Sequence, residues 1–220
     1  MKFAFLYDLQ KDIENYKVAS KSINSTEPTK MQARYIAEFG NVFEDQSLEL
    51  FIKKVLVKQK LDMQTEAERF KMEWQTIESE YLKRVERIFG IKSPLDIIRI
   101  YLTTDGRCSY NTSQGYFFIS ATRQGQNKTI MHELLHFWTG WLFYQEVEGG
   151  RMTYKDYNDV KESLTELLNL EFKDLLGEAE DGGYPQHQAL RAIVRTTWNE
   201  TKDIQQVFKA ISKACIYLEV

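Results

Sequence analysis

Two of the chain's three histidines stand four residues apart in the stretch TIMHELLHFW, residues 129–138, and a glutamate follows the first of them. On an α-helix four residues turn through roughly 400°, so His132 and His136 project from one face, one turn apart. Two imidazoles in that arrangement can bind one small cation, and Zn2+ accepts nitrogen ligands in tetrahedral geometry. Glu133, rotated by roughly 100° from His132, is better placed to act as a general base than as a ligand.

A catalytic zinc site needs a third protein ligand and one open position. The segment KESLTELLN, residues 161–169, offers Glu162 and Glu166, which share a face of a predicted helix because they are four residues apart. If that helix packs beside the HELLH helix, one glutamate can bind the metal. The other can then accept a hydrogen bond from a ligand histidine and hold its tautomer.

The order of these motifs resembles the gluzincin class of zinc metallopeptidases, which includes thermolysin. The resemblance covers roughly residues 95–180. It implies Glu162 as the third ligand and Glu166 as the acidic residue that supports a histidine, and the reverse assignment stays open. It also implies a peptidase that hydrolyses peptide bonds with a zinc-activated water and Glu133 as general base. The substrate would be a peptide or protein segment in extended form.

Two further parts of a gluzincin site have candidates in the sequence. In this class an edge strand upstream of the metal helix binds substrate by strand addition, and YFFIS, residues 116–120, is the candidate. A tyrosine or histidine after the third ligand often stabilises the oxyanion, which points to Tyr184 and His187. Neither of these two residues has a spacing that decides its role, and ordinary loop positions are the alternative.

A plainer interpretation is a packed helix whose histidines have found structural partners. Apolar residues surround the HELLH helix on nearly all sides, which predicts burial. Burial makes the charge of Glu133 costly unless a metal or cleft water compensates it. For Glu162 and Glu166 the plain alternative is a solvated helix face. The competing function is therefore a non-catalytic helical binding or regulatory protein with a structural or vestigial metal site.

The elements that must position this chemistry follow from periodicity and turn residues. Helical patterns are expected at residues 8–20 and 29–60, with the looser stretch SINSTEPT, residues 22–29, between them. One longer helix is expected from Thr65 to Phe89, with a capping box at Thr65 and Glu68 and a stop at Gly90.

The pattern changes after Pro94. Residues 96–104 indicate a strand and residues 108–122 a second strand or hairpin. The HELLH helix, a helix over about 155–177 and mostly helical residues 187–217 follow. We therefore expect an α+β fold, mostly helical, with a small mixed or antiparallel sheet beside the HELLH helix. A helical region at 1–94 and a zincin-like core at 95–220 are expected to form one compact unit.

Composition limits the partners. The chain has 220 residues and a net charge of −3, so no global field favours nucleic acid or an anionic membrane. Its start lacks the long apolar run of a secretion signal, and no stretch approaches the roughly 20 apolar residues that span a bilayer. The two cysteines, far apart in sequence, indicate a reducing compartment, and we expect the cytoplasm. Oligomeric state stays open.

Overall fold

The computed structural model describes residues 1–21 and 27–218, and the side chains up to residue 215. Most of the predicted SINSTEPT loop, residues 22–26, lies outside the described residues. Contacts divide the chain into two units. Unit 1 contains residues 1–76 and 95–127, and unit 2 contains residues 77–94 and 128–220. The sequence predicted one compact unit with a regional boundary at residue 94. Contacts instead give two units, and each of them combines two separate segments of the sequence.

Unit 1 holds a four-stranded mixed sheet in the order β1-β2-β4-β3. Strands β1 (Lys2–Leu6), β2 (Ile97–Thr103) and β4 (Tyr116–Ser120) run parallel, and β3 (Tyr110–Asn111) pairs antiparallel with β4. The predicted α+β class is therefore confirmed. Strand β1 was missed within a segment expected to be helical, because its partner β2 lies more than 90 residues further along the chain.

The YFFIS segment forms β4, but it is not the edge strand that we expected. It lies between β2 and β3, and all five residues are buried. The edges of the sheet are β1 and β3. Its unbroken apolar run fits this position, because a strand covered on both faces needs no polar alternation.

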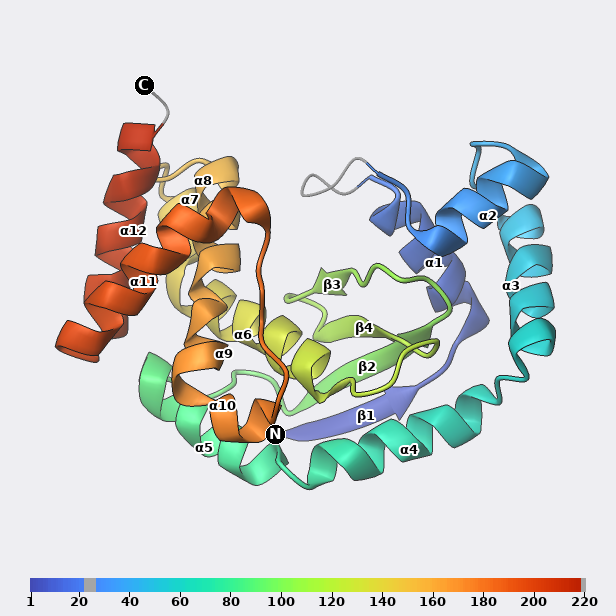
Figure 1. Ribbon diagram of the computed structural model, residues 1–220, viewed down its shortest axis with the longest axis horizontal. Helices are drawn as coiled ribbons and strands as arrows, with labels where there is room; N and C mark the ends of the chain where they lie inside the picture. The colour runs from blue at the N-terminus through green and yellow to red at the C-terminus, as the bar shows by residue number, and fades with distance from the viewer. Residues whose placement is uncertain (22–26, 219–220) are drawn as a thin grey trace. The chain divides into compact units, whose positions relative to one another are not determined.

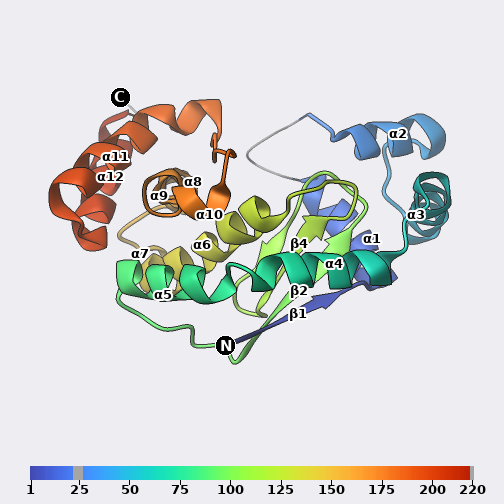
Figure 2. The same ribbon diagram turned by 60° about the horizontal axis from the view of Figure 1, so that its bottom comes forward.

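Two helices cover opposite faces of the sheet, as Figure 2 shows. Alternation places Phe3 on the face that contacts helix α4 (Met63–Gln75), where its ring meets Trp74 edge-on at 5.4 Å. Tyr116 lies on the other face and donates a hydrogen bond to Glu14 of helix α1 (Leu9–Ala19). Helices α2 (Lys30–Phe39) and α3 (Asp45–Gln59) pack with α1 around the buried rings of Tyr16, Tyr35 and Phe51.

The predicted helix 65–89 is two helices. Helix α4 begins after Asp62, whose carboxylate accepts hydrogen bonds from the amides of Gln64 and Thr65, so the capping box expected at Thr65 is wrong. It ends at Gln75, and α5 (Glu78–Phe89) follows after Thr76 and Ile77, at the boundary between the units. The apolar spacing continues across this break, which is why periodicity did not reveal it. Gly90, with φ of 68°, ends α5 as expected.

All regular secondary structure among the described residues of unit 2 is helical. Besides α5 this unit contains α6 (Asn127–Phe143), α7 (Gln145–Glu148), α8 (Tyr154–Leu164), α9 (Glu166–Glu171), α10 (Lys173–Leu176), the 3-10 turn η1 (Pro185–His187), α11 (Gln188–Thr201) and α12 (Ile204–Leu218). Helix α6 starts at the last residue of unit 1. Helices α11 and α12 pack against each other and against α8 (Figure 1). The helix predicted over 155–177 is interrupted at Thr165 and again at Phe172.

Candidate metal centre

Helix α6 carries the HELLH motif in the interior of unit 2. Contacts from two directions fix it there: the Tyr81 hydroxyl of α5 donates to the carbonyl of Met131 at 2.9 Å, and the ring of Phe143 stacks on Phe208 of α12 at 3.9 Å. One turn of helix separates His132 from His136, and their ring centroids are 4.5 Å apart. The side chain of His136 is 2% exposed and that of His132 is 21% exposed. The predicted pairing of the two imidazoles is therefore present.

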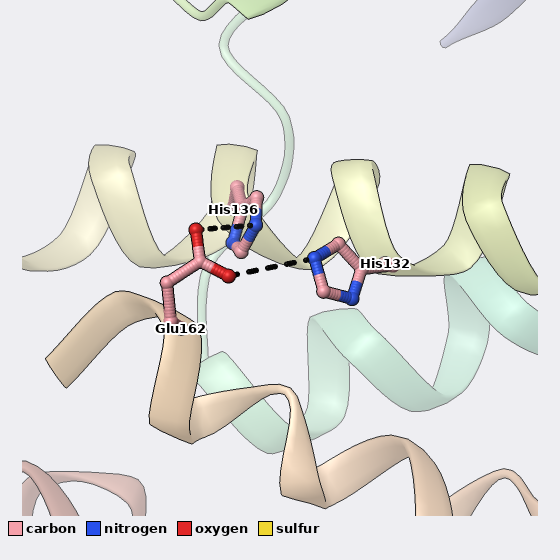
Figure 3. A group of neighbouring side chains, drawn as sticks. All are labelled: His132, His136 and Glu162. Carbon is pink, nitrogen blue, oxygen red and sulfur yellow. Dashed lines mark ion pairs between the residues drawn. The ribbon is translucent and has the colours of Figure 1, made fainter. Parts of the chain in front are cut away.

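Glu162 reaches the two histidines from helix α8, as Figure 3 shows. Its Oε2 lies 3.7 Å from His132 Nε2, and its Oε1 lies 3.5 Å from His136 Nε2. One ligand atom from each of the three residues lies within 4.8 Å of the others. Two imidazole nitrogens and one carboxylate oxygen form a donor set that zinc accepts. The three side chains thus fit a metal ion, and Glu162 is the glutamate that faces the histidines.

Asp181 orients His132, a role that the sequence analysis gave to Glu166. Its Oδ2 lies 2.6 Å from His132 Nδ1, which leaves Nε2 of that ring toward Glu162. Asn169 holds the backbone of Asp181 through two hydrogen bonds of 2.9 Å, one to its amide and one to its carbonyl. The Asp181 Oδ1 faces Thr165 Oγ1 at 2.9 Å and Arg191 Nη1 at 3.1 Å. A carboxylate placed in this way fixes the tautomer and direction of a ligand imidazole.

Gly183 leaves space for the side chain of Arg191, which contacts Asp181. Its φ is +60°, and an added Cβ would lie only 2.8 Å from two side-chain atoms of Arg191. The sequence offered one weak signal for Asp181, namely an acidic residue before two glycines in a predicted loop. Nothing in its spacing connects it to His132, 49 residues away.

Glu166 lies away from the histidines. Thr165 ends α8, so Glu166 begins a new helix and no longer shares a face with Glu162. Its carboxylate is buried and pairs with Arg191 at 2.8 Å and with Arg195 at 2.5 Å. Because Arg191 and Asn169 contact both Glu166 and Asp181, Glu166 is connected to the centre indirectly, through these two residues. The i, i+4 argument failed because it assumed an uninterrupted helix.

Glu133 is buried beside the cluster, and its Oε2 has no hydrogen-bond partner among the described residues. Burial raises the pKa of Glu133 to about 7; the charge of His132 opposes this shift and the charge of Glu162 adds to it. Buried carboxylates without a partner are costly, so an unpartnered oxygen indicates a group that the protein's own donors do not satisfy. A carboxylate with a pKa near 7 can both accept and return a proton at neutral pH.

The charges of the three candidate ligands are coupled. Burial would lower the pKa of His132, but hydrogen bonds to Asp181 and Glu162 outweigh it and raise that pKa to about 10. Burial and the charge of Lys161 hold the pKa of His136 well below its ordinary value. The pKa of Glu162 also lies well below its usual range, because His136 and His132 overcome the effect of burial. Without metal, the two neighbouring carboxylates therefore favour the protonated form of His132, whereas burial and Lys161 favour the neutral form of His136.

Lys161 is a second residue that the sequence analysis missed. Its side chain is 4% exposed, and its ammonium lies 2.9 Å from Glu162 Oε1. The segment KESLTELLN contains this lysine, but a lysine on a predicted helix is normally assigned to the surface.

Tyr184 and His187 lie next to each other, with ring centroids 5.7 Å apart. His187 is buried in η1, and its Nε2 lies 2.9 Å from Oδ1 of Asp159. Asp159 stands on α8 one turn before Glu162. The Nδ1 atom of His187 has no hydrogen-bond partner among the described residues. These contacts place His187 against α8, the helix that supplies Glu162, while its role in chemistry stays a prediction.

No known protein family, characterised protein or solved structure matches the chain. Within the described residues, no helix is both long and apolar enough to cross a membrane. Membership of the gluzincin class therefore stays a prediction from the sequence motif.

Proposed function

We propose that this chain is a zinc-dependent peptidase. The observation that supports the proposal best is the convergence of His132, His136 and Glu162 beside a buried glutamate with an unpartnered oxygen. The ligand types match catalytic zinc sites with two histidines and one glutamate. Four residues with these roles also fit the gluzincin pattern, so the proposal includes a zincin-like core.

Each residue has one task in this proposal. His132, His136 and Glu162 hold the ion, and Asp181 keeps His132 directed toward it. A zinc ion held by these residues would supply Lewis acidity and make water a better nucleophile at neutral pH. Glu133 takes a proton from water and returns it to the leaving amine. Its raised pKa suits both steps at neutral pH.

The substrate class that we propose is a peptide or protein segment in extended form. Tyr184 and His187 are the proposed donors to the oxyanion. We also propose a cytoplasmic location, because the chain has two cysteines that lie far apart in sequence and form no CxxC pair.

A non-catalytic binding or regulatory protein is the second candidate. The observation that favours it is the ion pair between Lys161 and Glu162, which compensates the ligand carboxylate without any metal. Such a pair would persist in a protein whose site had lost its metal or had kept it only for structure.

Elemental analysis and cleavage of a peptide library separate these candidates. For a peptidase we expect about one zinc per chain in the wild-type protein and in Glu133→Gln, and loss of zinc in His132→Ala. Cleavage should disappear in both variants. Zinc binding without cleavage of any peptide would favour the regulatory protein. No bound zinc under zinc-replete conditions would exclude the peptidase.

A further inference from the structure

The buried ammonium of Lys161 faces an oxygen that the proposed metal would use. Glu162 Oε1 lies 2.9 Å from Lys161 Nζ and 3.5 Å from His136 Nε2. The lysine and the imidazole therefore approach one carboxylate oxygen. Lys161 and Glu162 are 4% and 6% exposed, so solvent screens their charges weakly.

Burial of a lysine requires compensation, because moving an ammonium out of water costs several kcal/mol without a partner. Glu162 supplies that compensation for Lys161, and Lys161 supplies it for Glu162. On the other oxygen of Glu162, His132 stands at 3.7 Å and is itself paired with Asp181. The carboxylate thus has positive or potentially positive groups on both oxygens without a metal.

We propose that Lys161 is an internal counter-ion that competes with the divalent cation for Glu162. It keeps the centre preformed without metal, so that zinc binds to a folded protein. It also weakens binding, because zinc at Glu162 must share the carboxylate with a fixed positive charge. This inference rests on the proposed metal site and adds to it the residue that sets the metal affinity.

Two physical effects of Lys161 are both expected to weaken zinc binding. The ammonium repels a dication at short range in a region of low dielectric constant. It also occupies part of the hydrogen-bonding capacity of Oε1 and withdraws electron density from a ligand oxygen. A lysine that merely supported the ligand would have the opposite effect, since groups that orient ligands raise metal affinity.

The test compares zinc affinity and thermal stability in the full-length chain. Zinc chloride is titrated against a chromophoric chelator for wild type, Lys161→Met, Lys161→Arg and Lys155→Met. Lys155 is an exposed lysine on the same helix, so its substitution changes net charge without changing the centre. We expect Lys161→Met to bind zinc at least tenfold more tightly than wild type. The other two variants should stay within threefold of wild type.

Melting temperatures with and without zinc are a second test of the role of Lys161. Lys161→Met should melt below wild type without zinc, because Glu162 loses its compensating charge, and should gain more from saturating zinc. Equal or weaker zinc binding by folded Lys161→Met overturns the inference while leaving the metal site intact. If Lys161→Met fails to fold without zinc but folds with it, the inference is supported. Failure to fold even with zinc, in Lys161→Met and in Lys161→Gln, overturns it.

Failure of the proposed function gives a different pattern. If neither wild type nor any lysine variant binds zinc, the metal site itself is wrong and the inference falls with it. If wild type binds no zinc but Lys161→Met does, the counter-ion role is supported. Such a result would also favour the non-catalytic alternative for the natural chain.

Discussion

Each of the two units contains a buried carboxylate whose pKa is raised to about 7, Asp12 in unit 1 and Glu133 in unit 2. Burial is the largest cause in both. Their surroundings differ. Both oxygens of Asp12 accept hydrogen bonds, from the hydroxyl of Thr103 and from the amide and hydroxyl of Thr104. Glu133 Oε2 has no partner among the described residues.

The contrast shows that a perturbed pKa does not by itself identify a functional group. Asp12 joins helix α1 to the end of strand β2, and the hydrogen bonds that it accepts there compensate the cost of burying its carboxylate. Glu133 stands beside three potential metal ligands. A raised pKa together with an unsatisfied oxygen and convergent ligands is the stronger functional signal.

The largest expected effect concerns Glu133→Gln. We expect the rate of peptide hydrolysis to fall by about 10³-fold or more, because the general base is removed. Zinc content should not change. The free energy of unfolding should stay equal or rise, because no donor among the described residues loses its acceptor at Oε2. Chemical denaturation and cleavage assays on one preparation measure both. A variant that retains activity would show that Glu133 is not the base.

Glu166→Gln should mainly reduce stability. Its carboxylate pairs with the buried Arg191, and removing one partner of a buried pair costs about 3 kcal/mol or more. Zinc affinity should stay within a few-fold of wild type, whereas Glu162→Gln should lower it much further. Urea denaturation measures the free energy of unfolding, and competitive titration measures the zinc affinity. A larger loss of zinc affinity in Glu166→Gln than in Glu162→Gln would make Glu166 the ligand.

Asp12→Ala extends the comparison to unit 1. We expect the free energy of unfolding to fall by about 2 kcal/mol, because the Thr104 amide and hydroxyl lose their acceptor in a buried position. Zinc binding should be unaffected. Because the folded pKa of Asp12 lies above its unfolded value, its contribution lowers stability as pH rises from about 4 to about 7. This pH dependence should disappear in the variant.

A further prediction concerns the pH dependence of zinc binding. In the metal-free protein His132 holds a proton up to a pKa of about 10, and a metal requires its Nε2 without a proton. Zinc affinity should therefore rise about tenfold per pH unit between pH 7 and 9 from this group. In Asp181→Asn the slope should decrease, since the imidazolium loses a charged partner. Calorimetry in two buffers counts the protons released, and an unchanged count in Asp181→Asn would contradict the role of Asp181.

Local rules predicted part of the site and missed the rest for identifiable reasons. The pairing of His132 with His136 follows from helix geometry alone. The choice of Glu162 required the resemblance to a family, because helix geometry treated it and Glu166 alike until Thr165 ended α8. Asp181 reaches His132 through the folding of a loop onto α6, which no local pattern encodes. In unit 1 the strand β1 was missed for the same reason, because its neighbour is remote in sequence.

The parallel pairing of β1 with β2 has a practical consequence for anyone who shortens this chain. A fragment that starts at residue 95 would keep β2 but remove its neighbour, and with it the Phe3 and Phe5 side chains of the sheet. The backbone groups of β2 that face β1 would then be exposed along an apolar strand, which is a template for association with other molecules. Such a fragment would retain His132, His136 and Glu162, yet we expect it to aggregate when expressed.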